Sequence, residues 1–251
     1  MKLGFIGIGN MKEETKTQKL MDIKDLFRNS WNIYKKDFKK FLIIAVIFFG
    51  ITSLPTIFIG LKIPEVEVQP TPTSTFMPIR AEPFFTVPWY LFFLIILATM
   101  FIGILGSASL ISAVKEVPKD WRVKDALKEG WSKYRPFFLV SLLTGLIIGL
   151  GFLFLIVPGI IFAVWFGFSS YVVICEDKRG FKALSRSREL VKGHWWSVAK
   201  RVFAIMIITF SFSMGAQFIP YLGQFSFMIL FTPFSVIYNY LIYQNLKEMK
   251  G

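Results

Sequence analysis

The chain has 251 residues, a net charge of +13 and one cysteine, and 54% of its residues are hydrophobic and 18% aromatic. Soluble proteins average about 45–50% apolar and about 25% charged residues. Here only 18% of the residues are charged, and the mean hydropathy is +0.56. The composition excludes a disordered chain and a disulfide scaffold, and it argues against an ordinary soluble enzyme.

Four long stretches contain no Asp, Glu, Lys or Arg. They cover 21, 32, 40 and 45 residues, over Phe41–Leu61, Pro83–Val114, Pro136–Cys175 and Val202–Leu246. A helix needs about 20 apolar residues to cross the hydrocarbon core of a bilayer. The first two stretches therefore hold one transmembrane span each, and the last two are long enough for two spans each.

Both of the longest stretches carry a break. Pro158-Gly159 divides the third stretch, and Pro220 with Gly223 divides the fourth. Proline removes a backbone donor and glycine tolerates turn geometry, so each pair favours a tight turn at a membrane face. These breaks predict an all-α integral membrane protein with six transmembrane helices arranged as three hairpins.

The predicted layout is an N-terminal tail over 1–20 followed by a single membrane domain over 21–251. The spans are expected at about 41–61, 89–114, 137–157, 160–175, 202–219 and 224–246, with an external loop over 62–88. The span 160–175 is short, so a re-entrant hairpin over 137–175 that does not fully cross is a second interpretation. A single helix kinked at Pro158 is a third, and the distribution of charge argues against it.

Lys and Arg residues set the expected orientation, because they are retained on the cytoplasmic side of spans. Residues 1–40 carry 10 basic side chains, 115–135 carry 7, 176–201 carry 8 and the tail from Lys247 carries 2, whereas 62–82 carries only 2. The pattern predicts a multi-pass protein of the cell (cytoplasmic) membrane with both termini cytoplasmic. The charge of +13 is then a topology signal rather than a sign of nucleic-acid binding.

Three basic segments precede the three pairs of spans and resemble one another. The first segment carries an apolar stripe at helical spacing: Ile23, Phe27, Trp31, Tyr34 and Phe38. The second repeats it 100 residues later: Val123, Leu127, Trp131, Tyr134 and Phe138. The third, offset by 157, keeps only the outline: Gly180, Leu184, Arg188, Val191 and Trp195. The spacing predicts an amphipathic cytoplasmic helix before each hairpin and an internal parallel repeat.

Aromatic residues flanked by Lys and Arg are typical of helices that lie in the lipid headgroup layer. The candidate headgroup contacts are Lys35, Lys36, Lys133, Arg135, Arg186, Arg188 and Lys192. The candidate interfacial aromatics are Trp31, Trp131, Trp195 and Trp196. The expected partners are membrane lipids, with anionic lipids preferred. Packing of the stripes against the transmembrane bundle is an equally open interpretation.

Motifs for catalysis are weak. Gly7 and Gly9 resemble a dinucleotide-binding fingerprint, but Lys12 stands where a small residue is needed, and no βαβ unit follows. His194 is the single histidine, so a zinc site lacks ligands. We therefore expect no catalytic residues, no cofactor, no metal site and no enzymatic activity.

Small and polar residues occur within the predicted spans. One set comprises Gly103, Gly106, Ser107, Ser109 and Ser112, and a second comprises Gly145, Gly149 and Gly151. Close helix packing is the preferred interpretation of both. Gln217 and Asn239 lie in opposed spans and are expected to form a hydrogen bond between helices.

Several short runs carry a resemblance to a known family. They are Val157-Pro-Gly-Ile-Ile161, Ala183-Leu-Ser-Arg-Ser187 and Val191-Lys-Gly-His-Trp-Trp196. The chain resembles a prokaryotic family of multi-span membrane proteins, similar to the membrane domain associated with glycerophosphodiester phosphodiesterases. The hydrolase domain of some relatives is missing here, so the resemblance implies a membrane fold without phosphodiesterase activity.

The expected function is that of a non-enzymatic membrane scaffold or lipid-interacting component. The alternative is a transporter or channel for a lipid or another neutral or apolar solute, with the small-residue faces around 103–112 and 141–151 lining its path. The sequence identifies neither a protein partner nor an oligomeric state.

Overall fold

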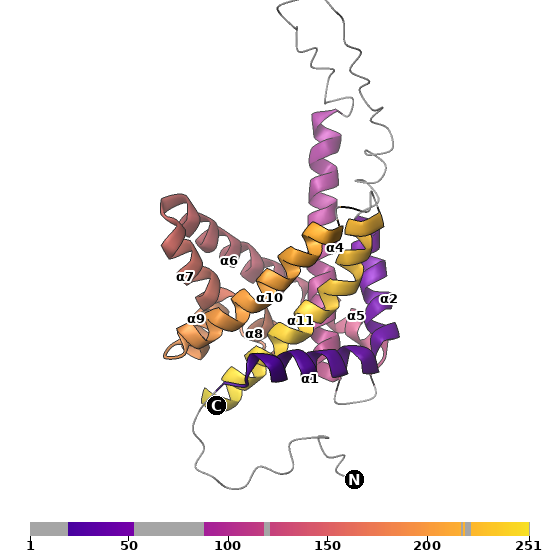
Figure 1. Ribbon diagram of the computed structural model, residues 1–251. Helices are drawn as coiled ribbons and strands as arrows, with labels where there is room; N and C mark the ends of the chain where they lie inside the picture. The colour runs from indigo at the N-terminus through magenta and orange to yellow at the C-terminus, as the bar shows by residue number, and fades with distance from the viewer. Residues whose placement is uncertain (1–19, 53–87, 118–120, 217, 219–221, 251) are drawn as a thin grey trace, which may run out of the picture.

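The computed structural model describes residues 20–52, 88–117, 121–216, 218 and 222–250, and it consists of helices joined by short turns in these ranges, with no strand among them (Figure 1). The elements are α1 (Ile23–Lys36), α2 (Phe38–Ala45), the π-helical turn η1 (Val46–Gly50), α4 (Trp89–Glu116), α5 (Val123–Ser132), α6 (Tyr134–Phe154), α7 (Ile156–Phe166), α8 (Ser169–Glu176), α9 (Phe181–Val191), α10 (Trp195–Ala216) and α11 (Leu222–Lys250).

Five helical segments of the described chain are long and apolar enough to cross a membrane. They are Trp89–Glu116, Tyr134–Phe154, Ile156–Glu176, Trp195–Ala216 and Ser226–Lys250. Each overlaps a predicted span, so the all-α class is confirmed, and the length and apolar composition of these helices indicate a membrane protein. The predicted first span, 41–61, is described only as far as 52, where α2 and η1 form its beginning. The sixth span and the three-hairpin arrangement therefore stay predictions.

Other predictions fall outside the described residues. These include most of the tail 1–20, nearly all of the external loop 62–88 and the turn at Pro220. Gly223, the other half of that break, lies inside α11. Helix α10 begins at Trp195, seven residues before the predicted span, and so takes in Lys200 and Arg201.

The predicted turn at Pro158-Gly159 is wrong by three residues. Helix α6 ends at Phe154, Leu155 alone is extended (φ −161°, ψ 148°), and α7 begins at Ile156. Pro158 is thus in the first turn of α7, where a missing N–H costs no intrahelical hydrogen bond. An added Cβ on Gly159 would lie 2.5 Å from the ring of Phe152, so this glycine allows close packing of α6 on α7.

The predicted span 160–175 is two helices rather than one. Helix α7 ends at Phe166 and α8 begins at Ser169, with the chain bending at Gly167 and Phe168. A Cβ on Gly167 would lie 2.7 Å from the carbonyl oxygen of Ala163. The absence of a side chain at Gly167 therefore permits this tight bend, which brings Phe168 into the core.

The two ends of the described chain meet at one end of the bundle. Helix α1 crosses the lower part of α11 in Figure 1, and α4 stands upright in the same bundle. The backbone N–H of Met21 donates to the side-chain oxygen of Asn245, at 2.9 Å. Tyr238 and Tyr243 of α11 are fully buried in the core that these helices share. This end carries α1, α5 and α9, the three predicted amphipathic segments.

The turn between α6 and α7 is apolar and exposed. Phe154 is 77% exposed and Leu155 67%. The turn nevertheless pairs its backbone internally, since Leu155 N–H donates to Gly151 and Gly159 N–H donates to Leu155. In addition, α6 has 21 residues, or about 31 Å, and leans away from α4 in Figure 1. An apolar turn of this kind is more stable in hydrocarbon than in water.

We expect the α6–α7 turn to end inside the bilayer, as in the re-entrant interpretation. In a Cys175→Ala background, Leu155→Cys should resist membrane-impermeant maleimides added to either side. Lys182→Cys, on the exposed surface of α9, serves as the reactive control. Rapid labelling of Leu155→Cys from outside would show instead that the hairpin crosses completely.

Candidate functional site: a basic face and an aromatic groove

Three short helices pack on the bundle through equivalent small residues. Ser30, Gly130 and Ser187 occupy matching positions of α1, α5 and α9, and all three are buried. Ser30 donates to the carbonyl of Leu26 (2.7 Å), and Ser187 donates to that of Trp165 (2.7 Å). The prediction from sequence considered only the large residues of the apolar stripe and therefore missed these contacts. The recurrence of a small residue at the offsets of 100 and 157 could have predicted them.

The aromatic stripes lie beside the buried faces of these helices rather than on them. Tyr34 is buried, but Trp31 is 48% exposed and Trp131 64% exposed. Both tryptophans can therefore reach lipid while their neighbours pack on the bundle. In the third segment Trp195 is half-buried, and Trp196 is exposed.

Two of the candidate headgroup cations are already engaged in ion pairs. Lys133 lies 2.7 Å from the carboxylate of Asp177 and 3.2 Å from that of Glu129. The hydrogen bond from Lys133 lowers the pKa of Asp177. Arg186 lies 3.1 Å from Glu176. These ion pairs connect α5 and α6 with α8 and α9. They stabilise the packing at the end of the bundle that carries α1, α5 and α9, which we call the basic face.

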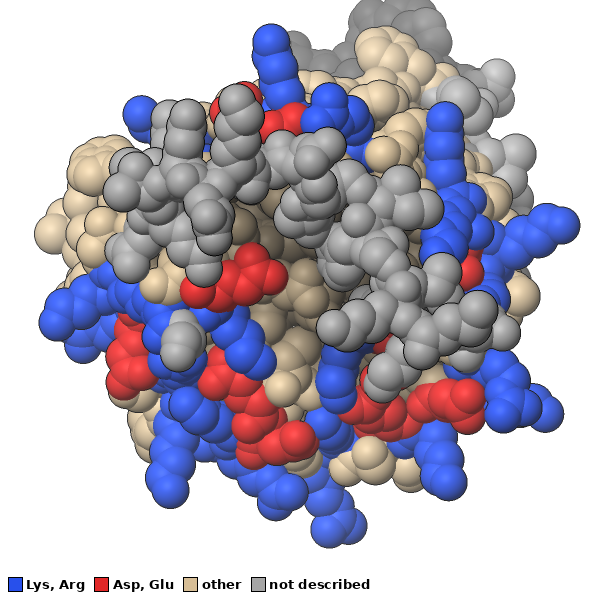
Figure 2. All heavy atoms as spheres, turned by 90° about the horizontal axis from the view of Figure 1, so that it is seen from below, with Lys and Arg blue, Asp and Glu red and all other residues tan. Residues whose placement is uncertain are grey.

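The other candidate cations project from the surface of this face. They are Lys35, Lys36, Arg135, Arg188 and Lys192, and all are exposed. Figure 2 views the molecule from this end and shows Lys and Arg side chains around its rim, with fewer Asp and Glu side chains among them. The arrangement is suited to contact with anionic headgroups.

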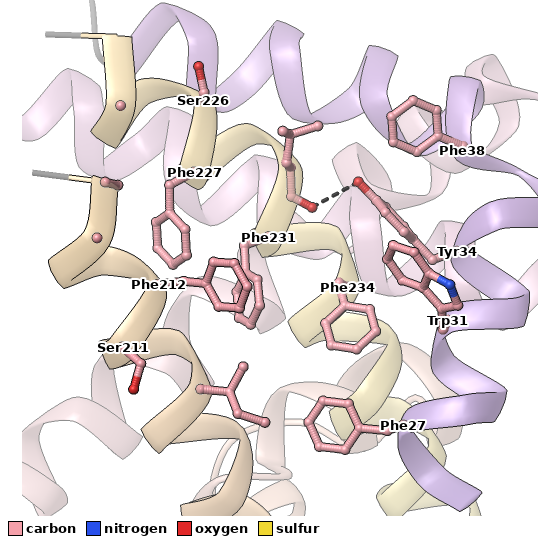
Figure 3. A pocket seen from close by; sticks show the side chains of 15 residues that line it. Phe27, Trp31, Tyr34, Phe38, Ser211, Phe212, Ser226, Phe227, Phe231 and Phe234 are labelled. Atoms are coloured by element: carbon pink, nitrogen blue, oxygen red, sulfur yellow. Dashed lines mark hydrogen bonds between the residues drawn. The ribbon is translucent and has the colours of Figure 1, made fainter. Parts of the chain in front are cut away.

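An aromatic groove opens beside α1, between α10 and α11 (Figure 3). Its volume is about 1130 Å³. It is lined by Phe27, Trp31, Tyr34, Phe38, Ile208, Ser211, Phe212, Gly215, Ala216, Gly223, Ser226, Phe227, Leu230, Phe231 and Phe234. Because hydrocarbon and aromatic side chains make up nearly the whole lining, its chemistry fits an acyl chain.

One end of the aromatic groove carries charge. Lys35 Nζ lies 5.1 Å from the ring centroid of Trp31, a cation–π contact. Beside it, the hydroxyl of Tyr34 donates to the carbonyl of Leu230, at 2.8 Å, and thereby fixes α1 to α11. Burial raises the pKa of Tyr34 to about 12, so the phenol stays neutral at physiological pH. The groove thus has an apolar lining and a cation against one of its lining residues.

The predicted small-residue faces are confirmed only in part. An added Cβ on Gly106 would collide with Phe48 at 2.6 Å, and one on Gly151 would come within 3.0 Å of Gly159. Around Gly103, Gly145 and Gly149 nothing lies within 4 Å, so packing does not explain them.

The polar residues of the spans are bonded within their own helices or packed. Ser109 is buried and donates to the carbonyl of Leu105 (2.9 Å), and Ser112 is buried as well. Asn239 donates to the carbonyl of Ser235, four residues earlier in α11. The predicted hydrogen bond between Asn239 and Gln217 stays a prediction, because Gln217 lies outside the described residues.

Arg201 is a buried cation that sequence reasoning overlooked, because it stands next to a charge-free stretch. Its guanidinium donates to three backbone carbonyls: Met21 at 2.8 Å, Leu20 at 2.9 Å and Ser197 at 2.6 Å. The side chain is only 9% exposed. It therefore anchors the start of the described chain to α10 and is a structural residue rather than a surface contact.

Comparison with protein families places the chain in one of them. The family model described as "Domain of unknown function (DUF7847)" matches residues 83–242, from just before α4 to near the end of α11. No curated protein and no solved structure matches the chain. The comparisons give no link to the membrane domain associated with glycerophosphodiester phosphodiesterases. The match covers more than half of the 251 residues, and the chain belongs to the DUF7847 family.

Proposed function

We propose that this protein is a non-enzymatic, multi-pass protein of the cytoplasmic membrane that binds anionic lipid at its basic inner face. The observation that carries the proposal is the aromatic groove, with an apolar interior and Lys35 stacked on Trp31 at its mouth. An acyl chain would occupy the groove while the anionic headgroup meets Lys35. Both termini would be cytoplasmic, as the distribution of Lys and Arg predicts.

Three amphipathic helices would extend this contact across the inner leaflet. Exposed Trp31 and Trp131 stand at equivalent positions of α1 and α5, and each is followed four residues later by an exposed cation, Lys35 or Arg135. Such pairs of aromatic and basic side chains suit the headgroup layer. The repeated placement supports a scaffold that gathers anionic lipid beneath it. The buried Ser109 and Ser112 favour binding over solute transport, because this part of the expected path is packed, whereas the positions beside Gly103, Gly145 and Gly149 are open.

Filling the aromatic groove should weaken the binding of lipid at this site. Gly215 lines the groove, and nothing lies within 4 Å of a Cβ built on it, so Gly215→Phe would place a ring in the open space without disturbing the fold. We expect the variant to bind phosphatidylglycerol at least about tenfold more weakly than the wild type. Native mass spectrometry of the full chain, titrated with lipid, measures this loss.

Two controls make that test specific. Gly145→Phe adds the same ring to an equally open position on α6, away from the groove, and should leave binding unchanged. Lys35→Gln should reduce the preference for phosphatidylglycerol over phosphatidylcholine, whereas Lys128→Gln, an exposed cation on α5, should not. Equal affinities of the wild type and Gly215→Phe would refute the aromatic groove as the lipid site.

A further inference from the structure

A second groove runs along α7 to the turn between α9 and α10. Its volume is about 670 Å³. It is lined by Val157, Ile160, Ile161, Trp165, Lys192, Gly193, Trp195 and Trp196. One end is therefore aliphatic and belongs to a predicted span, and the other end holds indole rings and an ammonium group at the basic face. We call it the α7 groove.

The polar end of the α7 groove is positively charged. Lys192 lines it and is exposed, and the Arg188 guanidinium lies 4.5 Å from the ring centroid of Trp165, another lining residue. The ammonium of Lys250 donates to the backbone carbonyls of Glu189 and Lys192 and brings a third cation to this turn. Glu189 is the acidic residue of the same turn, and its carboxylate is paired with Arg186 at 3.6 Å.

Helix α10 begins at this end of the groove. Gly193 adopts φ +89°, a left-handed conformation that turns the chain into the helix. The first backbone bond into α10 runs from Val198 N–H to His194 (2.9 Å). The amides before Val198 thus have no carbonyl partner within the helix and carry the positive end of its dipole. Such a terminus attracts phosphate groups.

Two buried nitrogen atoms of the turn also lack partners. Nε1 of Trp195 and Nδ1 of His194 are enclosed and form no hydrogen bond with any described residue. The indole Nε1–H is a donor, and a buried donor without an acceptor is costly.

We propose that the α7 groove binds one phospholipid, with its phosphate at the start of α10 and an acyl chain along Val157, Ile160 and Ile161. Lys192 and Arg188 would neutralise the phosphate, and the ring of exposed Trp196 would cover the glycerol region. The proposal rests on the lipid-binding function in taking a membrane phospholipid as the ligand. Its residues are distinct from those of the aromatic groove, so each site can fail without the other.

The test is a lipid titration of the full chain followed by native mass spectrometry, with phosphatidylglycerol as the probe. The wild type should hold two tightly bound lipids. The double variant Arg188→Gln/Lys192→Gln should lose one of them, with an affinity for that site reduced at least about fivefold. The charge-matched variant Lys124→Gln/Lys182→Gln removes two exposed cations elsewhere on the same face and should retain both lipids.

Comparison with the aromatic groove separates the two proposals. Gly215→Phe should remove the other lipid, and combining it with Arg188→Gln/Lys192→Gln should remove both. Retention of two lipids by Arg188→Gln/Lys192→Gln would overturn the α7 site and leave the proposed function standing. Displacement of that lipid by millimolar inorganic phosphate would show a general anion site, which would also overturn the assignment of a phospholipid.

Discussion

Replacing Arg201 with leucine should lower the free energy of unfolding by about 3 kcal/mol or more, one of the two largest effects we expect. The substitution leaves the carbonyls of Leu20 and Met21 without the guanidinium donor, and it removes the contact with the carbonyl of Ser197, which the helix itself still pairs. Hydrogen bonds to charged groups contribute about 1.5–3 kcal/mol each, and buried acceptors left unpaired add a desolvation penalty. Reversible SDS denaturation in mixed micelles, followed by far-UV circular dichroism, measures the change.

Lys200→Leu is the matched control for this effect. Lys200 precedes Arg201 in α10 and is exposed, so the same loss of charge should change stability by less than about 0.5 kcal/mol. Arg201→Leu should also release the start of α1, and trypsin should then cut after Lys24 faster than in the wild type. If Arg201→Leu is as stable as Lys200→Leu, the three carbonyl contacts do not hold this end of the chain.

Gly130→Ala should destabilise the protein by about 2–3 kcal/mol, although the change adds a single methyl group. The new Cβ would lie 2.4 Å from Oγ of Ser109 and 2.9 Å from its backbone N and Cα, so a rotamer change of Ser109 cannot relieve the clash. Overpacking of this kind costs about 1–3 kcal/mol. It should also separate Glu129 from Lys115, now 2.9 Å apart. Denaturation of the variant and the wild type under the same conditions gives the difference.

Gly103→Ala should stabilise the protein, in contrast to Gly130→Ala. Gly103 lies in α4, as Ser109 does, but nothing is within 4 Å of a Cβ built on it. Alanine is favoured over glycine inside a helix by about 0.5–1 kcal/mol. If Gly103→Ala is stabilised and Gly130→Ala is destabilised, the close approach of Ser109, and not helix propensity, determines the stability change at position 130. Two neutral substitutions would contradict the packing described here.

The membrane class and the positions of the spans could be predicted, because charge is costly in hydrocarbon and its absence is visible in sequence. Helix α4, over Trp89–Glu116, lies within three residues of its predicted limits at each end. The turn near Pro158 could not be placed, since proline is accepted in the first turn of a helix as readily as between helices. The bend at Gly167 was missed because it depends on the space beside Ala163.

The candidate site was less predictable than the fold. The cations and tryptophans of α1, α5 and α9 were identified by type and spacing, but spacing alone does not show that Lys133 is held by Asp177 while Lys35 is free to stack on Trp31. The aromatic groove joins α1 with α10 and α11, which are far apart in the chain. The groove exists because of how these helices pack on one another, and local sequence patterns do not predict this packing.

The apolar turn of the α6–α7 hairpin has a consequence for membrane shape. If the hairpin stops inside the bilayer, as expected, it adds cross-sectional area to the leaflet from which it enters and none to the opposite one. Because Gly151 and Gly159 hold α6 and α7 in close contact, the hairpin behaves as a stiff wedge. Many copies inserted together would expand that leaflet against the other, and the membrane would relieve the asymmetry by becoming convex on the expanded side. The protein would then concentrate where the membrane already has that curvature.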